Sequence, residues 1–206
     1  MIVKVCGMRE SSNIREIESL GIDWMGFIFY PNSKRFVKDV PGYLPSRCRR
    51  VGVFVNSDIR DVRHVQEEFG LDLIQLHGDE SPEFCKSLRN VLPHDIKIIK
   101  ILKVTGKESF ESLESFTPLV DYFLFETPCM SYGGSGRQFD WDLTMHYKGD
   151  VPFLLTGGIG EDDWKRVKEF RHPQFAGIDL NSRFEFRPGL KSAEKLSGFL
   201  SNLRGF

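Results

Sequence analysis

The fold is decided by the stretch Pro152-Phe153-Leu154-Leu155-Thr156-Gly157-Gly158-Ile159-Gly160, in which a short apolar run passes directly into a glycine-rich turn. A stretch with helical spacing follows at Trp164–Phe170, and a second apolar run comes after it at Gly177–Asn181. Two strands joined through a crossover helix run parallel, because the helix returns the chain to the end of the sheet at which the first strand began. The stretch therefore predicts one βαβ unit.

The same order of elements repeats outward along the whole chain. Short runs rich in β-branched and aromatic residues occur at Ile2–Cys6, Trp24–Tyr30, Val51–Asn56, Leu71–His77, Lys97–Val104, Tyr122–Glu126, Pro152–Thr156 and Gly177–Asn181. Stretches with helical spacing occur at Asn13–Leu20, Ser57–Phe69, Ser81–Val91, Trp164–Phe170 and Ser192–Leu203. Eight strands in 206 residues give about 26 residues a unit, which predicts an α/β protein: a single (β/α)8 barrel, or TIM barrel, over residues 1–206. A doubly wound open sheet is the alternative that the same pattern allows.

Two of the predicted helices carry start signals. Asn13, with Glu16 three residues later, resembles a capping pair, and Ser81 followed by Pro82 is typical of an N-cap and a first helical position. The connections after the second and the sixth strand have weaker helical signals, so we expect short or irregular helices there.

The composition is that of an ordinary globular chain, with 40% hydrophobic and 28% charged residues. A net charge of −1 creates no global field that would attract nucleic acid or an anionic membrane, so we expect neither as a partner. No apolar run approaches the length of a bilayer span, and the N-terminus shows no signal-peptide pattern. The cysteines lie far apart in the sequence, which argues against disulfides and zinc and predicts a cytoplasmic protein; they are Cys6, Cys48, Cys85 and Cys129.

Polar residues fall on the predicted inner face of the barrel, close to the carboxyl ends of the strands, where barrel enzymes carry their active sites. The alternation of side chains along each strand places Lys4 and Cys6 inward, with His77, Glu126 and Asp179 on other strands. Each has a structural explanation when taken alone: a small buried thiol, a satisfied imidazole, a loop carboxylate, or an ion pair between Lys4 and Asp179 on adjacent strands. Their convergence on one mouth favours a catalytic site.

Glycine-rich loops give a second functional signal. The loops after the seventh and eighth strands of a barrel commonly bind phosphate through backbone N–H groups, and here they contain Gly157-Gly158 and Asn181-Ser182. A plain turn explains a bare glycine pair equally well, so the position at the seventh unit is what predicts a phosphate-binding barrel. The loop after the sixth strand contains Tyr132–Gly136, which we interpret as a lid or a second region of backbone contact.

Taken in order, the motifs of this chain resemble the phosphoribosylanthranilate isomerase family. The residues that carry the resemblance are Val3–Met8, Gly26–Phe29, Ser33–Val37, Gly52–Asn56, Ile74–Glu80, Tyr132–Gly136, Phe139–Trp141, Gly157-Gly158, Gly177–Ser182, Glu185 and Pro188-Gly189. The resemblance implies an isomerase that converts N-(5-phosphoribosyl)anthranilate to 1-(2-carboxyphenylamino)-1-deoxyribulose 5-phosphate by an acid–base Amadori rearrangement in tryptophan biosynthesis. It implies a small phosphorylated substrate, no metal and no organic cofactor. The sequence is compatible with a monomer or a homodimer.

The family's residue roles are carried over by matching position. They imply that Cys6 is the general base, Glu126 the general acid and Arg35 the partner of the anthranilate carboxylate. The other implied substrate-binding residues are His77, Gly157, Gly158, Asn181 and Ser182, with Lys4 and Asp179 in support. A cysteine base acts as a thiolate, so we expect a lowered pKa for Cys6, with Lys4 as the source of positive charge.

Two departures from the family pattern bear on function. Glu126 stands where the family ordinarily has aspartate, and the extra methylene moves the carboxyl by about one ångström, a displacement that can cost about 100-fold in rate. Arg183 stands where glycine is common, which places a charge either near the phosphate or in solvent. The alternatives are therefore a phosphate-binding barrel of the same family with weak or lost catalysis, and a barrel enzyme acting on another phosphorylated sugar.

Overall fold

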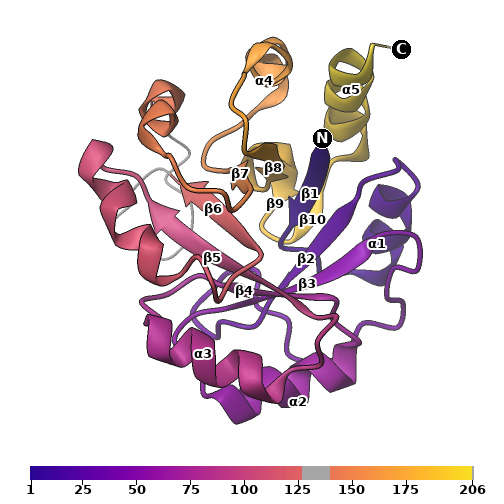
Figure 1. Cartoon of the computed structure of the whole chain (residues 1–206). Helices are drawn as coiled ribbons and strands as arrows, with labels where there is room; N and C mark the ends of the chain where they lie inside the picture. The colour runs from indigo at the N-terminus through magenta and orange to yellow at the C-terminus, as the bar shows by residue number, and fades with distance from the viewer. Residues whose placement is uncertain (127–139, 206) are drawn as a thin grey trace.

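Eight parallel strands close into a barrel in the computed structural model, which describes residues 1–126 and 140–205 (Figure 1). In chain order they are β1 (Ile2–Cys6), β2 (Trp24–Ile28), β3 (Arg49–Phe54), β4 (Leu73–Leu76), β5 (Lys97–Lys103), β6 (Tyr122–Glu126), β7 (Phe153–Leu155) and β8 (Phe175–Leu180). Each strand pairs with the next, and β8 pairs with β1, so the sheet has no free edge. The predicted barrel is confirmed, and the open sheet is wrong.

Helices cover the outside of the barrel, as Figure 1 shows. They are α1 (Ser11–Glu18), α2 (Ile59–Phe69), α3 (Pro82–Val91), α4 (Trp164–Glu169) and α5 (Ala193–Arg204). Within the described residues, four 3₁₀ segments complete the connections: η1 (Lys107–Ser115), η2 (Trp141–His146), η3 (Glu161–Asp163) and η4 (Ser182–Phe184). Residues 29–48, all of them described, contain no helix, and η2 is the described helical segment between β6 and β7. The weak helical signals at these two connections therefore matched short or absent helices. None of the described helices is long and apolar enough to cross a membrane.

One of the two predicted helix starts is confirmed and the other is wrong. The Ser81 hydroxyl accepts a hydrogen bond from the backbone N–H of Phe84, as an N-cap does. Asn13 instead lies inside α1, where the helix has already begun at Ser11. Its buried amide makes two hydrogen bonds to the backbone of Lys191, so a tertiary contact uses the side chain that the capping pattern assigned to the helix end.

The core has two layers that the strand alternation separates. Val3, Val5, Phe123 and Phe125 point outward, where helices pack on the sheet. The lumen is filled by a smaller cluster of buried apolar side chains: Trp24, Val51, Leu73, Ile99, Leu124 and Leu154. Because this cluster fills the barrel below the polar residues, the barrel is a packed support for its mouth and not a pore.

A short antiparallel hairpin, which no pattern in the sequence predicted, follows β8. Its strands are β9 (Glu185–Arg187) and β10 (Leu190–Lys191). The turn contains Pro188 and Gly189, and Gly189 has a φ of 85°, in the left-handed region that glycine tolerates. The hairpin brings Glu185 and Lys191 to the mouth of the barrel, which gives it a direct bearing on the site.

Candidate active site

A pocket opens at the carboxyl ends of the strands, and nine of the ten predicted site residues line it. They are Cys6, Arg35, His77, Glu126, Gly157, Gly158, Asp179, Asn181 and Ser182. The tenth, Lys4, is completely buried one inward position below Cys6 on β1. The predicted convergence at one mouth is therefore confirmed as geometry, while the role of each residue stays a prediction.

An ion pair between the first and the last strand of the barrel lies beneath the pocket. Lys4 and Asp179 are neighbours in the β1–β8 register, and Lys4 Nζ lies 2.7 Å from Asp179 Oδ2. Burial alone lowers the pKa of Lys4, but Asp179 and Cys6 raise it above its ordinary value, so Lys4 is a cation. The other oxygen of the buried carboxylate, Oδ1, has no hydrogen-bond partner among the described residues.

The Cys6 thiol lies directly above this pair. Gly26 on β2 makes room for it, since a Cβ at Gly26 would lie 2.7 Å from Cys6 Sγ. Burial raises the pKa of Cys6 above its ordinary value, although Lys4 and Lys191 lower it. The expectation of a lowered pKa is therefore wrong, because the cost of burying a thiolate outweighs the positive charge beside it.

Glu126 ends β6 on the same mouth, with only 5% of the residue exposed. Burial, followed by the charge of Asp179, raises the pKa of the Glu126 carboxyl to about 7. His77 lies beside it, with Nε2 3.7 Å from Glu126 Oε2, and burial together with Lys4 and Lys100 lowers the pKa of His77 to about 3. The imidazole is thus neutral, and the carboxyl changes its protonation state at neutral pH.

Gln75 contacts the ring nitrogen of His77 that lies away from Glu126. Its Nε2 lies 3.0 Å from His77 Nδ1. When this amide donates to Nδ1, the ring proton lies on Nε2, the nitrogen that faces Glu126. Gln75 stands two residues before His77, and that spacing alone does not show that the amide orients the ring.

Arg35 reaches the pocket from the connection after β2. Its aliphatic part lies over Gly7, whose φ is 81°, and a Cβ at Gly7 would lie only 2.6 Å from Arg35 Cδ. Its guanidinium pairs with Glu185 on β9, with Nη2 2.6 Å from Oε2. Glu185 was part of the resemblance but had no predicted role, and Lys191, which also contacts it, was missed altogether.

The glycine loops also line the pocket. Gly157 and Gly158 have φ values of 93° and 73°, so this turn requires residues that adopt the left-handed region. The side chain of Arg183 is exposed and lies beside Gly160, outside the residues that line the pocket. The Tyr132–Gly136 loop and Cys129 lie outside the described residues.

The family model for N-(5'-phosphoribosyl)anthranilate isomerase matches residues 3–202 of the chain. The chain belongs to this family. A relative named N-(5'-phosphoribosyl)anthranilate isomerase, from Parabacteroides distasonis, is 47% identical over 209 residues, which cover 98% of this chain and 93% of the relative.

Solved structures agree with this assignment to the phosphoribosylanthranilate isomerase family. The enzyme from Thermus thermophilus superposes with a TM-score of 0.84 at 26% identity, covering 100% of this chain and 99% of the other. A phosphoribosylanthranilate isomerase in complex with reduced 1-(o-carboxyphenylamino)-1-deoxyribulose 5-phosphate superposes with a TM-score of 0.80 at 26% identity, covering 100% of both chains. The prediction of an isomerase of tryptophan biosynthesis is thus confirmed at the level of the family.

Proposed function

We propose that this chain converts N-(5'-phosphoribosyl)anthranilate to 1-(2-carboxyphenylamino)-1-deoxyribulose 5-phosphate. The observation that carries the proposal is the pairing, in one pocket, of the Cys6 thiol with a carboxyl group, Glu126, whose pKa is about 7. An acid with that pKa holds a proton at neutral pH and still gives it up, which is what ring opening requires.

In the first step Glu126 is the general acid. It donates its proton to the ring oxygen of the ribose while the bond from that oxygen to C1 breaks. The lone pair of the anthranilate nitrogen forms the C1=N bond of a cationic Schiff base. The neutral His77 Nε2 beside the carboxyl is suited to stabilise the carboxylate that remains.

In the second step Cys6 is the general base. Its thiolate removes the proton from C2, the C2–H electrons form the C1=C2 bond, and the nitrogen recovers its lone pair. The resulting enolamine tautomerises to the ketone. Burial keeps the thiolate scarce, but the cationic Schiff base adds a positive charge to the pocket and favours the thiolate when the base is needed.

The remaining residues bind the substrate. Arg35 suits the planar anthranilate carboxylate, since a guanidinium binds such a group through two parallel hydrogen bonds. The phosphate fits the backbone of the loops at Gly157-Gly158 and Asn181-Ser182. Asp179 Oδ1, buried and without a protein partner among the described residues, is a suitable acceptor for a sugar hydroxyl.

A turnover assay tests the proposal. Freshly generated phosphoribosylanthranilate is followed by loss of its fluorescence with wild type, Cys6→Ser and Glu126→Gln, and with Cys48→Ser as the control because Cys48 lies at the other end of the barrel. We expect wild type and Cys48→Ser to turn over equally and the two site variants to lose about 100-fold or more. Absence of turnover in wild type, with recovery in Glu126→Asp, would instead indicate a barrel that binds substrate and has lost its acid.

A further inference from the structure

The guanidinium of Arg35 already contacts a carboxylate of the chain itself. Nε donates to Glu185 Oε1 at 2.9 Å and to Oε2 at 3.2 Å, and Nη2 donates to Oε2 at 2.6 Å. The substrate carboxylate therefore meets an arginine that is not free, and the geometry of this pair decides what the arginine is able to do.

The contact uses only one edge of the guanidinium. Nε and Nη2 form the side-on edge, and Nη1 has no hydrogen-bond partner among the described residues. A guanidinium carries five N–H donors in a fixed plane, so the end-on edge made by Nη1 and the second N–H of Nη2 is still able to bind a second carboxylate. Arg35 is thus able to hold Glu185 and the substrate at the same time.

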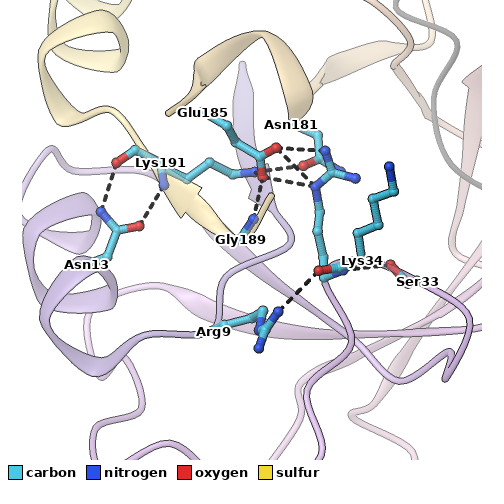
Figure 2. Close-up of polar contacts among 9 residues, drawn as sticks. Arg9, Asn13, Ser33, Lys34, Asn181, Glu185, Gly189 and Lys191 are labelled. Atoms are coloured by element: carbon cyan, nitrogen blue, oxygen red, sulfur yellow. Dashed lines mark hydrogen bonds and ion pairs between the residues drawn. The ribbon is translucent and has the colours of Figure 1, made fainter. Parts of the chain in front are cut away.

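Glu185 has little freedom to move. Besides Arg35, its Oε1 accepts hydrogen bonds from Lys191 Nζ at 2.5 Å and from the backbone N–H of Gly189 at 3.0 Å (Figure 2). Only 4% of its side chain is exposed. Although burial raises the pKa of Glu185, Arg35 and Lys191 lower it below its ordinary value, so the group is a fixed anion.

Lys191 completes the charge balance. Its side chain is fully buried, and its Nζ also donates to Asn181 Oδ1 at 2.7 Å. The two hydrogen bonds from Asn13 hold its backbone, as Figure 2 shows. Burial lowers the pKa of Lys191 to about 8, which still leaves the ammonium mostly protonated at pH 7. With two cations around one anion, the cluster of Arg35, Glu185 and Lys191 therefore has a net charge close to +1 at neutral pH. Without Lys191, Glu185 would cancel the charge of Arg35.

We propose that Glu185 and Lys191 are positioning residues for carboxylate recognition: Glu185 holds the side-on edge of Arg35 so that the end-on edge meets the substrate carboxylate, and Lys191 keeps the cluster positive. This inference rests on the proposed function, in which Arg35 binds the anthranilate carboxylate. Lys191 also contacts Asn181, whose backbone borders the phosphate loops, so one buried ammonium joins the two ends of the substrate site.

A competing arrangement, in which Glu185 blocks the carboxylate site, predicts the opposite change in affinity when the charge of Glu185 is removed. If Glu185 occupied the place of the substrate carboxylate, the substrate would have to displace it, and removing its charge would tighten binding. If Glu185 positions Arg35, removing its charge weakens binding. The direction of the change in affinity therefore separates the two arrangements.

The experiment measures inhibition constants for two probes: the reduced product analogue with its carboxyphenyl group, and the same compound with a plain phenyl group. Glu185→Gln should weaken the carboxyphenyl probe about 10- to 100-fold, the loss expected when charge-assisted hydrogen bonds are misaligned, and change the phenyl probe less than about threefold. Lys191→Met should act in the same direction. Glu10→Gln is the matched control, because it removes the exposed ion pair between Glu10 and Arg187 of the same hairpin.

A double-variant cycle separates positioning from a general loss of structure. In an Arg35→Met background, Glu185→Gln should cost the carboxyphenyl probe less than about threefold more, because the residue that it positions is gone. Equal losses for both probes, additive losses in the cycle, or tighter binding in Glu185→Gln would overturn the inference. Failure of the proposed function has a different signature: wild type would not turn over phosphoribosylanthranilate, whatever the two probes report.

Discussion

Replacing Glu126 by glutamine should make the protein more stable at pH 8 while removing its activity. The reason is the pKa of the buried carboxyl, which is about 7 in the folded chain against an ordinary value of 4.5. Between these two pH values the folded chain keeps a proton that the unfolded chain has released, so the free energy of unfolding falls as the pH rises. The cost of Glu126 is absent below about pH 4.5 and complete above about pH 7.

The size of the effect follows from the same two values. A difference of about 2.5 pKa units at 1.36 kcal/mol a unit corresponds to about 3 kcal/mol of stability lost by wild type across this window. Glutamine has nearly the same shape and no charge, so the Glu126→Gln variant does not lose this stability. The difference in stability between variant and wild type should therefore grow by about 3 kcal/mol from acidic to mildly alkaline pH.

Chemical denaturation followed by circular dichroism, at pH values from 4.5 to 8, measures this difference directly. Glu111→Gln, on the exposed side of η1, is the control and should show no comparable pH dependence. A stability difference between Glu126→Gln and wild type that stays constant with pH would refute the reasoning, because Glu126 would then be ionised throughout and unable to act as the acid at pH 7.

Three further predictions concern the same mouth of the barrel. Gly7→Ala should lower stability in thermal melts by about 1–3 kcal/mol and raise KM, because the φ of Gly7 is 81° and Arg35 approaches it closely. Gly198→Ala in α5, where a Cβ would meet nothing within 4 Å, should raise stability by about 0.5–1 kcal/mol in the same melts. A Gly198→Ala variant less stable than Gly7→Ala would contradict this reasoning. Lys4→Met should cost about 3–5 kcal/mol in urea denaturation at pH 7 by leaving Asp179 buried without its partner, and a cost below about 1 kcal/mol would show that the pair contributes little. For wild type, kcat/KM corrected for substrate ionisation should rise about tenfold a pH unit up to about pH 7 and then level off. Above pH 7 the protonated form of Glu126 becomes scarcer at the same rate as the thiolate of Cys6 becomes more common, so the two effects cancel. A decline that starts at pH 7 would show that Cys6 is already a thiolate at that pH.

Much of the fold was predictable because strand periodicity is a local signal. The bounds of β1 and β6 agree with the predicted ranges residue for residue, and the other strands differ by only a few residues at their ends. The inward placement of Lys4, Cys6 and Glu126 follows from alternation along those strands. The Lys4–Asp179 pair follows too, since closing the barrel makes the first and last strands neighbours.

The parts that were missed depend on contacts between distant segments. Arg35 and Glu185 are 150 residues apart, and neither stands in a periodic stretch that would indicate burial. Lys191 looks like a surface lysine, and only the folded hairpin shows that it is buried. Asn13 illustrates the limit of a local motif: its spacing to Glu16 suits a cap, yet its amide binds a segment that the motif does not contain. The direction of the Cys6 pKa was wrong for the same reason, because burial is a property of the whole barrel.

The seam between β1 and β8, where the barrel closes, affects how the protein regains activity when it folds. Lys4 and Asp179 are 175 residues apart, so pairing them closes a much longer loop than pairing strands that are adjacent in sequence, and costs more chain entropy. Cys6 belongs to one side of that seam and Asn181 to the other. Helices and neighbouring strands form from segments that are close in sequence, and their spectroscopic signals return as soon as those segments order. The rate at which catalysis recovers during refolding therefore reports the pairing of β1 with β8. A chain that has regained its secondary structure but has not paired these two strands is inactive.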